Sequence, residues 1–109
     1  MKLILDTSKV SFTVTRGVEP KVDRNNGRQM TDRNTGQELY TVQLMALDEN
    51  GAEVILVTVA GDVRAVTQGT PVSVVELEAI PWNTERGEKR MAYRARSVTP
   101  INAGKPATA

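Results

Sequence analysis

The 109-residue sequence contains no cysteine and no histidine, and only four of its residues are aromatic: one Trp, two Tyr and one Phe. The absence of cysteine excludes disulfide frameworks, thiolate zinc sites and cysteine nucleophiles. The absence of histidine removes the side chain that most often acts as a general base near neutral pH and often ligates metals. These absences predict a protein that works by binding and is not an enzyme, and we expect neither a metal nor a cofactor.

Long apolar runs are also missing. Near the N-terminus only three apolar residues, 3–5, precede the carboxylate of Asp6, which is far too short a stretch for a signal peptide or a membrane span. A cytoplasmic location is therefore expected. The length is typical of one domain, which can bury roughly two thirds of its unfolded surface. We expect that domain to cover residues 1–99 and the small residues of 100–109 to form a disordered tail.

The net charge of +1 conceals a segregation of charge along the chain. Residues 1–37 carry seven Lys or Arg against four Asp or Glu, and residues 81–109 carry six against two. Residues 38–80 carry one cation, Arg64, against seven acids. Two basic ends therefore flank an acidic middle.

Period-two alternation predicts a strand over residues 9–16, where Val10, Phe12 and Val14 share one face. Four more segments are rich in strand-forming residues, and they cover 39–47, 52–60, 70–80 and 90–98. The segments 39–47 and 52–60 are separated by a tight-turn signal and indicate a hairpin. Two segments, 17–37 and 81–89, have the composition of long loops, and Asp62 is a candidate cap for a short helical turn through Thr67.

Five short strands predict an all-β fold, a five-stranded OB-like barrel with long loops between strands 1 and 2 and between strands 4 and 5. A β-sandwich fragment and an SH3-like barrel are the alternatives. Closure into a barrel would remove the exposed sheet edges that an open sheet this apolar would present.

Ligands of OB barrels lie across strands 2 and 3 and are gripped by these two loops. Ten of the fourteen cations fall on the predicted loops and their flanking strand residues. The first group is Arg16, Lys21, Arg24, Arg28 and Arg33, and the second is Arg86, Lys89, Arg90, Arg94 and Arg96. Arg outnumbers Lys nine to five, which favours bidentate contacts with phosphate and stacking of guanidinium groups on bases.

Aromatic side chains could add stacking on bases, at about 1–3 kcal/mol per base. Phe12 follows the apolar alternation of its strand and is assigned to the core. Tyr40 could stack on a base or cover one end of the barrel. Trp82, between Pro81 and Asn83, could stack on a base or plug the barrel, and Tyr93, flanked by arginines, could face either way.

The order of these elements resembles that of the small OB-fold single-stranded-DNA-binding proteins of filamentous phages and bacterial conjugative plasmids. The resemblance covers roughly residues 3–99. It depends on the order of five segments: Val10-Ser11-Phe12-Thr13, the Arg-rich loop, Tyr40-Thr41-Val42-Gln43-Leu44, Gly69-Thr70-Pro71-Val72 and Tyr93-Arg94-Ala95. It implies cooperative coating of single strands by homodimers, with Arg16, Tyr40 and the loop cations along the groove. The chain departs from the family in a longer first loop, a Trp-bearing loop before the last strand, and an acidic middle.

The leading hypothesis is largely sequence-independent binding of single-stranded DNA by a homodimer in phage or plasmid replication or transfer. The predicted nucleic-acid-binding residues are Arg16, Lys21, Arg24, Arg28, Arg33, Tyr40, Trp82, Arg86, Lys89, Arg90, Tyr93 and Arg94. The alternative is a protein-interaction barrel, an accessory factor of plasmid transfer or replication whose partner docks on the acidic strands 2 to 4. The preference for DNA or RNA, the oligomeric state and the side on which the acidic segment faces stay open at this point.

Overall fold

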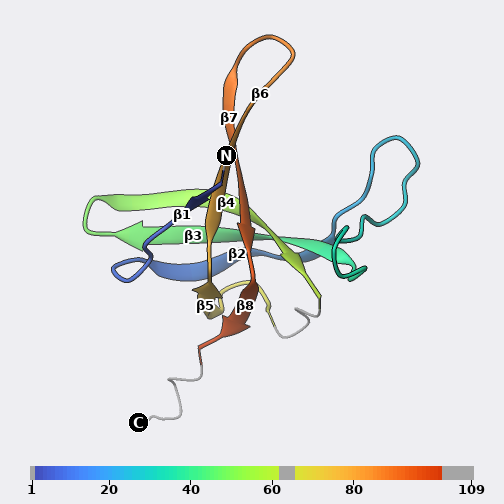
Figure 1. Ribbon diagram of the computed structural model, residues 1–109. Helices are drawn as coiled ribbons and strands as arrows, with labels where there is room; N and C mark the ends of the chain where they lie inside the picture. Colours follow the sequence, from blue (N-terminus) through green and yellow to red (C-terminus); the bar gives the residue numbers. More distant parts are fainter. Residues whose placement is uncertain (1, 62–65, 102–109) are drawn as a thin grey trace.

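The computed structural model of the chain describes residues 2–61 and 66–101, and in these residues it is all-β, with no helix. Figure 1 shows the strands, which belong to a single curled sheet. The eight strands are β1 (Leu3–Ile4), β2 (Ser11–Pro20), β3 (Leu39–Asp48), β4 (Gly51–Ala60), β5 (Pro71–Val75), β6 (Glu78–Asn83), β7 (Lys89–Ala95) and β8 (Ser97–Pro100).

The expected all-β class is confirmed, but the structure has eight strands where five were expected. The predicted fourth strand is divided into β5 and β6 at Glu76, and the predicted fifth into β7 and β8 at Arg96. Glu76 has a positive φ of 52°, which a regular strand does not tolerate. The chain therefore bends at this point.

The predicted loop boundaries also need correction. Strand β2 continues to Pro20, so the first loop covers 21–38, and β6 includes Trp82, so the second turn covers only 84–88. The helical turn expected from Asp62 begins in residues outside the described part of the chain, as do residues 102–109 of the expected tail.

The strand order in the sheet is β1-β6-β7-β4-β3-β2-β5-β8. All neighbours are antiparallel except β4 and β7, which run parallel. Strand β2 pairs with β3 along one edge and with β5 along the other, and β8 at the end of the order contacts β4. The sheet therefore curls on itself, with β2, β3 and β4 forming one layer and β5 and β8 lying below it in Figure 1.

The inside of this curl is the hydrophobic core. Alternate side chains of β2, β3, β4 and β5 point into it, as the period of two requires. The six most deeply buried side chains are Val14, Val42, Leu44, Val57, Val59 and Val72. Leu44 is 0% exposed and lies on the central strand, where its neighbours across the sheet are Val14 and Ile55.

Replacing Glu76 with glycine is expected to stabilise the fold. Glycine adopts positive φ without the clash that a Cβ creates, a difference of about 1 kcal/mol at such a position. The change also removes an exposed ion pair with Arg96 of 3.5 Å, which contributes little in water. Urea unfolding of Glu76→Gly and of Glu76→Ala separates the two effects, since only the glycine variant gains stability. Equal stabilities of the two variants would contradict this account.

Candidate functional site

The outward side of β3 and β4 is an exposed surface without charge. Because Val42, Leu44, Ile55 and Val57 are buried, the residues between them point outward. Cross-strand pairing sets these outward residues side by side as Thr41 with Thr58, Gln43 with Leu56 and Met45 with Val54. We call these six residues the uncharged face.

Apolar side chains are prominent in the uncharged face. Val54 and Leu56 are 58% and 55% exposed, and Met45 is half-buried between them and β2. Along the β2 side, the Thr15 hydroxyl lies 3.1 Å from Oε1 of Gln43. The other members of the face are half-buried, so Val54 and Leu56 form its exposed part. Exposed apolar side chains that lie close together are typical of a binding surface.

The acidic middle of the chain lies elsewhere. Asp48 and Glu49 are at the β3–β4 turn, and Glu53 pairs with Ala46 on the core side of the sheet. Glu78 lies on β6, two strands away from β4, with Lys2 Nζ at 4.0 Å. In the described part of the chain, the acids of residues 38–80 therefore lie off the outward surface of β3 and β4.

The loop of residues 21–38 consists of two small hairpins of nearly the same sequence. Asp23-Arg24-Asn25-Asn26-Gly27 recurs nine residues later as Asp32-Arg33-Asn34-Thr35-Gly36. In each hairpin the aspartate accepts a bond from the backbone N–H two residues on, at 2.8 and 2.7 Å, and the glycine has a φ of 69° or 75°. Each turn presents an exposed arginine, Arg24 or Arg33, and Arg28 is exposed beside the first. The sequence was interpreted as one long loop over 17–37, and the repeat was missed.

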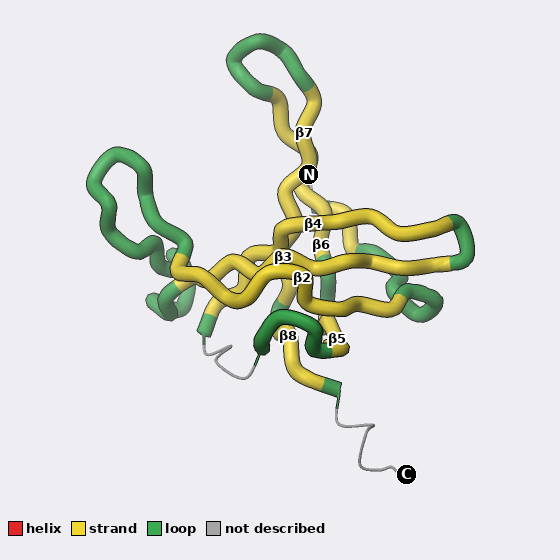
Figure 2. Tube along the Cα trace, turned by 180° about the vertical axis from the view of Figure 1, so that it is seen from behind, coloured by secondary structure: helices red, strands yellow, loops and turns green. Residues whose placement is uncertain are grey.

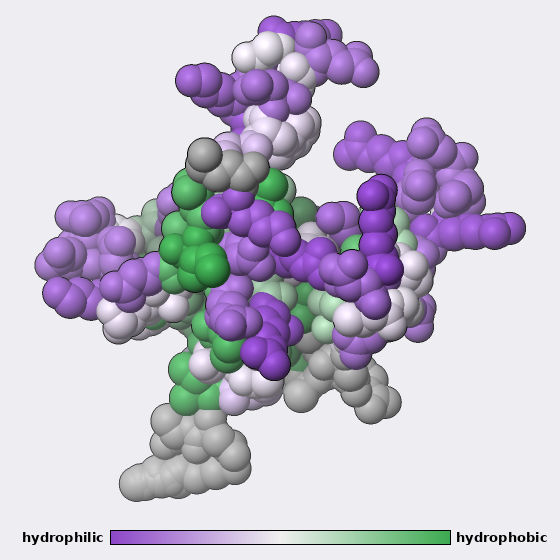
Figure 3. All heavy atoms as spheres, in the orientation of Figure 1, coloured by the Kyte–Doolittle hydropathy of each residue, from purple (hydrophilic) through white to green (hydrophobic). Residues whose placement is uncertain are grey.

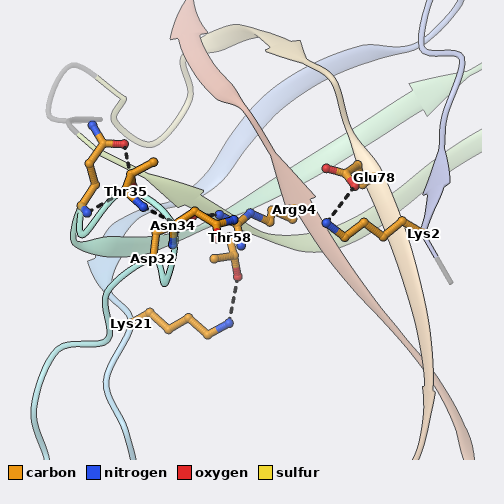
Figure 4. A network of polar contacts seen from close by, with 9 residues as sticks. Lys2, Lys21, Asp32, Asn34, Thr35, Thr58, Glu78 and Arg94 are labelled. Carbon is orange, nitrogen blue, oxygen red and sulfur yellow. Dashed lines mark hydrogen bonds and ion pairs between the residues drawn. The ribbon is translucent and has the colours of Figure 1, made fainter.

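A polar network fastens this loop to the sheet beside the uncharged face. The Asp32 carboxylate pairs with Arg94 of β7, and Lys21 Nζ donates to the Thr58 hydroxyl of β4 at 3.1 Å (Figure 4). Thr58 and Arg94 are direct neighbours in the β4–β7 register. Two predicted site residues, Lys21 and Arg94, are therefore brought together at one end of the uncharged face.

The charges in the network affect one another. The backbone N–H of Asn34 and, secondarily, the Arg94 guanidinium lower the pKa of the Asp32 carboxyl below its usual 3.8. Burial and the nearby Arg94 charge lower the pKa of Lys21 below 10.5. Asp32 is 7% exposed, so it is a buried carboxylate that stays ionised because donors surround it.

Acid is expected to weaken the fold through Asp32. Since its pKa is lower in the folded than in the unfolded chain, its stabilising contribution is complete above 3.8 and is lost as the pH falls through the folded-state value. Asp32→Asn should therefore be less stable at neutral pH and lose less stability than wild type between about pH 5 and about pH 3. Asp23→Asn, the equivalent change in the first small hairpin, is the comparison variant, because it weakens the same kind of backbone hydrogen bond but leaves the pair with Arg94 in place. Thermal unfolding over this range is the measurement, and parallel profiles for Asp32→Asn and wild type would contradict the prediction.

The β6–β7 hairpin is the second projecting element. It and the 21–38 loop both rise from the same side of the β2–β3–β4 layer in Figures 1 and 2. Trp82 is on β6, 50% exposed, with Arg90 as its cross-strand partner and Lys89 beside it. Arg86 is exposed in the turn, and Arg90 pairs with Glu88 at 3.2 Å. Trp82 was predicted in a loop; it lies in a strand and is open to solvent on its hairpin.

In Figure 3 the two projections are mostly in hydrophilic colours, and the body between them shows hydrophilic and hydrophobic colours side by side. The remaining predicted residues are more dispersed. Tyr40 and Tyr93 are half-buried and pack against the core, so their rings lie on the other side of the sheet from the uncharged face. Arg16 is exposed on β2, next to Gln43 in the register, and pairs with Glu19 at 3.4 Å.

Comparisons with protein-family models and with curated proteins find no match. Across residues 2–61 and 66–101, no helix is long and apolar enough to cross a membrane. The function therefore has to be argued from the surface itself.

Proposed function

We propose that this chain binds single-stranded DNA without catalysing a reaction, largely irrespective of sequence. The observation that carries the proposal is the uncharged face on β3 and β4. Lys21 and Arg94 lie at one end of it, and two projections tipped with arginine rise from the same side of the sheet layer. Cations would bind phosphates and release counterions, while apolar and aromatic side chains would contact bases.

An OB-like barrel is part of the proposal. If β5 and β6 are taken as one bent strand, and β7 and β8 as another, the pairings form a closed ring. In that ring β2 pairs with β3, β3 with β4, β4 with β7, β6 with β7, and β5 with β2. The ring has five segments, two of them bent, which supports the five-stranded interpretation. In such a barrel the uncharged face would lie on the strands that carry ligands in OB folds.

The chemistry favours single strands over duplex. A duplex hides the flat faces of its bases, whereas a single strand offers them to Trp82 and to the apolar side chains of Val54 and Leu56. Arginine guanidinium groups can contact phosphates and also stack on bases. Neither contact reads base edges, so little sequence preference is expected.

Fluorescence of Trp82, the one Trp in the sequence, tests this function. Oligo(dT) added at low salt should change the emission and shift the protein in a gel. The logarithm of the binding constant should fall linearly with the logarithm of salt, by about 0.7 per phosphate neutralised. Duplex DNA of equal length is the control and should bind more weakly. If oligo(dT) changes neither the fluorescence nor the mobility, the proposal is wrong.

A second candidate is the protein-interaction barrel, an accessory factor of plasmid transfer or replication. The exposure of Val54 and Leu56 favours it, since protein partners cover such apolar pairs. An acidic docking surface would have to lie on the core side of the sheet or at its turns, because the acids of the described residues lie off the uncharged face. A pull-down from nuclease-treated lysate that retains a stoichiometric partner would favour this candidate over DNA binding.

A further inference from the structure

A pocket opens on the core side of the sheet, on the opposite side from the uncharged face. It has a volume of ≈ 400 Å³. Its floor is apolar and aromatic, and includes Phe12, Ile55, Leu77 and Tyr93. The strand β7 that carries Tyr93 continues outward from here into the projecting hairpin.

Three carboxylates line the same pocket, Asp6, Asp48 and Glu53. Asp6 and Asp48 each use one oxygen to accept a backbone N–H, from Ser8 at 3.0 Å and from Asn50 at 2.8 Å. Among the residues the structure describes, none of the three forms an ion pair. The pocket also affects the Tyr93 phenol: burial, and secondarily the Glu53 charge, raise its pKa above 10.0.

The β6–β7 hairpin has the complementary pattern. Arg86, Lys89 and Arg90 outnumber Glu85 and Glu88 in its outer part, although Arg90 pairs with Glu88 at 3.2 Å. Pro81, Trp82 and Met91 give it an apolar surface, with Trp82 50% and Met91 45% exposed. The turn of one chain cannot reach the pocket of the same chain. Tyr93 lines the pocket, and residue 88 at the turn lies about 16 Å from it along an extended strand. The turn also points away from the body (Figure 1).

We propose that the pocket receives the basic tip of the β6–β7 hairpin of a second copy of this chain. The guanidinium and ammonium groups of the tip would pair with Asp6, Asp48 and Glu53, and the apolar surface of the hairpin would cover the rim. Two features of the hairpin match the pocket: an excess of positive charge facing the carboxylates, and an exposed apolar surface facing the apolar and aromatic floor. DNA and a second copy would compete for the same hairpin. The contact itself needs no nucleic acid, so it can be tested apart from the function proposed above.

The experiment is sedimentation velocity of the full chain, freed of nucleic acid, over a range of protein and salt concentrations. The wild-type chain should self-associate as its concentration rises, and less so at high salt, because exposed charge pairs are screened. Glu53→Lys should weaken association by about tenfold, since an attractive pair becomes repulsive. Glu49→Lys is the matched control: it makes the same charge change in the adjacent turn, but Glu49 does not line the pocket.

A second variant probes the other side of the contact. Arg86→Glu combined with Arg90→Glu should abolish self-association in the same way. Mixing this variant with Glu53→Lys should restore association, because the unaltered hairpin of the Glu53→Lys chain then meets the unaltered pocket of the other chain. A wild-type chain that stays monomeric, or association that survives both reversals, would overturn the proposal. So would a mixture that fails to associate while both variants are folded by circular dichroism.

Discussion

Leu44→Ala is expected to lower the free energy of unfolding by about 2–5 kcal/mol, a large part of the total for a small domain. Leu44 is 0% exposed on β3, and Val14 and Ile55 are its neighbours on the adjacent strands. The sheet curls around this point, so the surrounding strands cannot collapse into the cavity without losing their pairing. The missing methyl groups and the remaining cavity both contribute to the cost.

Urea unfolding measures this loss directly. Leu47→Ala is the control, because Leu47 is on the same strand, 44% exposed near the β3–β4 turn. Surface changes of this kind usually alter stability by about 0.5 kcal/mol or less. If the two variants were equally stable, the core would not be centred on β3, and the interpretation of the sheet as a curl around Leu44 would be wrong.

The same alternation that buries Leu44 made much of the fold predictable. Strand β2 begins where the period-two pattern indicated, and β3 and β4 lie where segments rich in strand-forming residues were found. The tight-turn signal does join β3 to β4. These features depend on residues close together in the sequence. The boundaries were less well predicted, since β2 extends to Pro20 through irregular pairing with β3 after Val14.

The bends at Glu76 and Arg96 could not be predicted in this way. They arise because one segment pairs with β2 at one end and with the β7 hairpin at the other, and this is a property of the whole sheet. Trp82 was placed in a loop because Pro81 and polar residues flank it. Proline is tolerated in an edge strand, and at Pro81 strand β6 pairs with β7 alone.

The candidate site shows the same division. Clusters of cations along the chain identified both projecting elements, because each cluster is local. The pairing of Asp32 with Arg94 joins residues 62 positions apart, and no local pattern contains it. The uncharged face, in contrast, could have been predicted from the sequence. The charge was counted over all of residues 38–80, and this count does not separate the outward residues of the two strands, which are all uncharged.

Trp82→Ala is expected to weaken binding of single-stranded DNA by roughly 5- to 150-fold, which corresponds to about 1–3 kcal/mol for one stacked base. The indole is 50% exposed on a hairpin that projects from the body, with Arg90 across the strand pair. A base stacked there would have its phosphate within reach of the cations of the turn. The fold should be little affected, because the ring is half in solvent before DNA binds.

Anisotropy of a labelled oligo(dT) is the measurement, since the variant has no tryptophan fluorescence. Trp82→Phe should recover most of the affinity, because a flat ring remains. Met91→Ala, a change at a 45% exposed residue of the same hairpin, should stay near wild type. If phenylalanine binds no better than alanine, Trp82 does not stack on a base.

The salt dependence separates stacking from charge in this hairpin. Trp82→Ala removes no cation, so it should lower affinity while leaving the slope against salt unchanged. Arg86→Ala together with Arg90→Ala should lower the affinity and also reduce the slope, by about 0.7 for each phosphate that the variant no longer neutralises. The same slope change in Trp82→Ala would mean that the indole acts by positioning the arginines. Removal of the indole would then weaken the contacts with phosphates and not the stacking on bases.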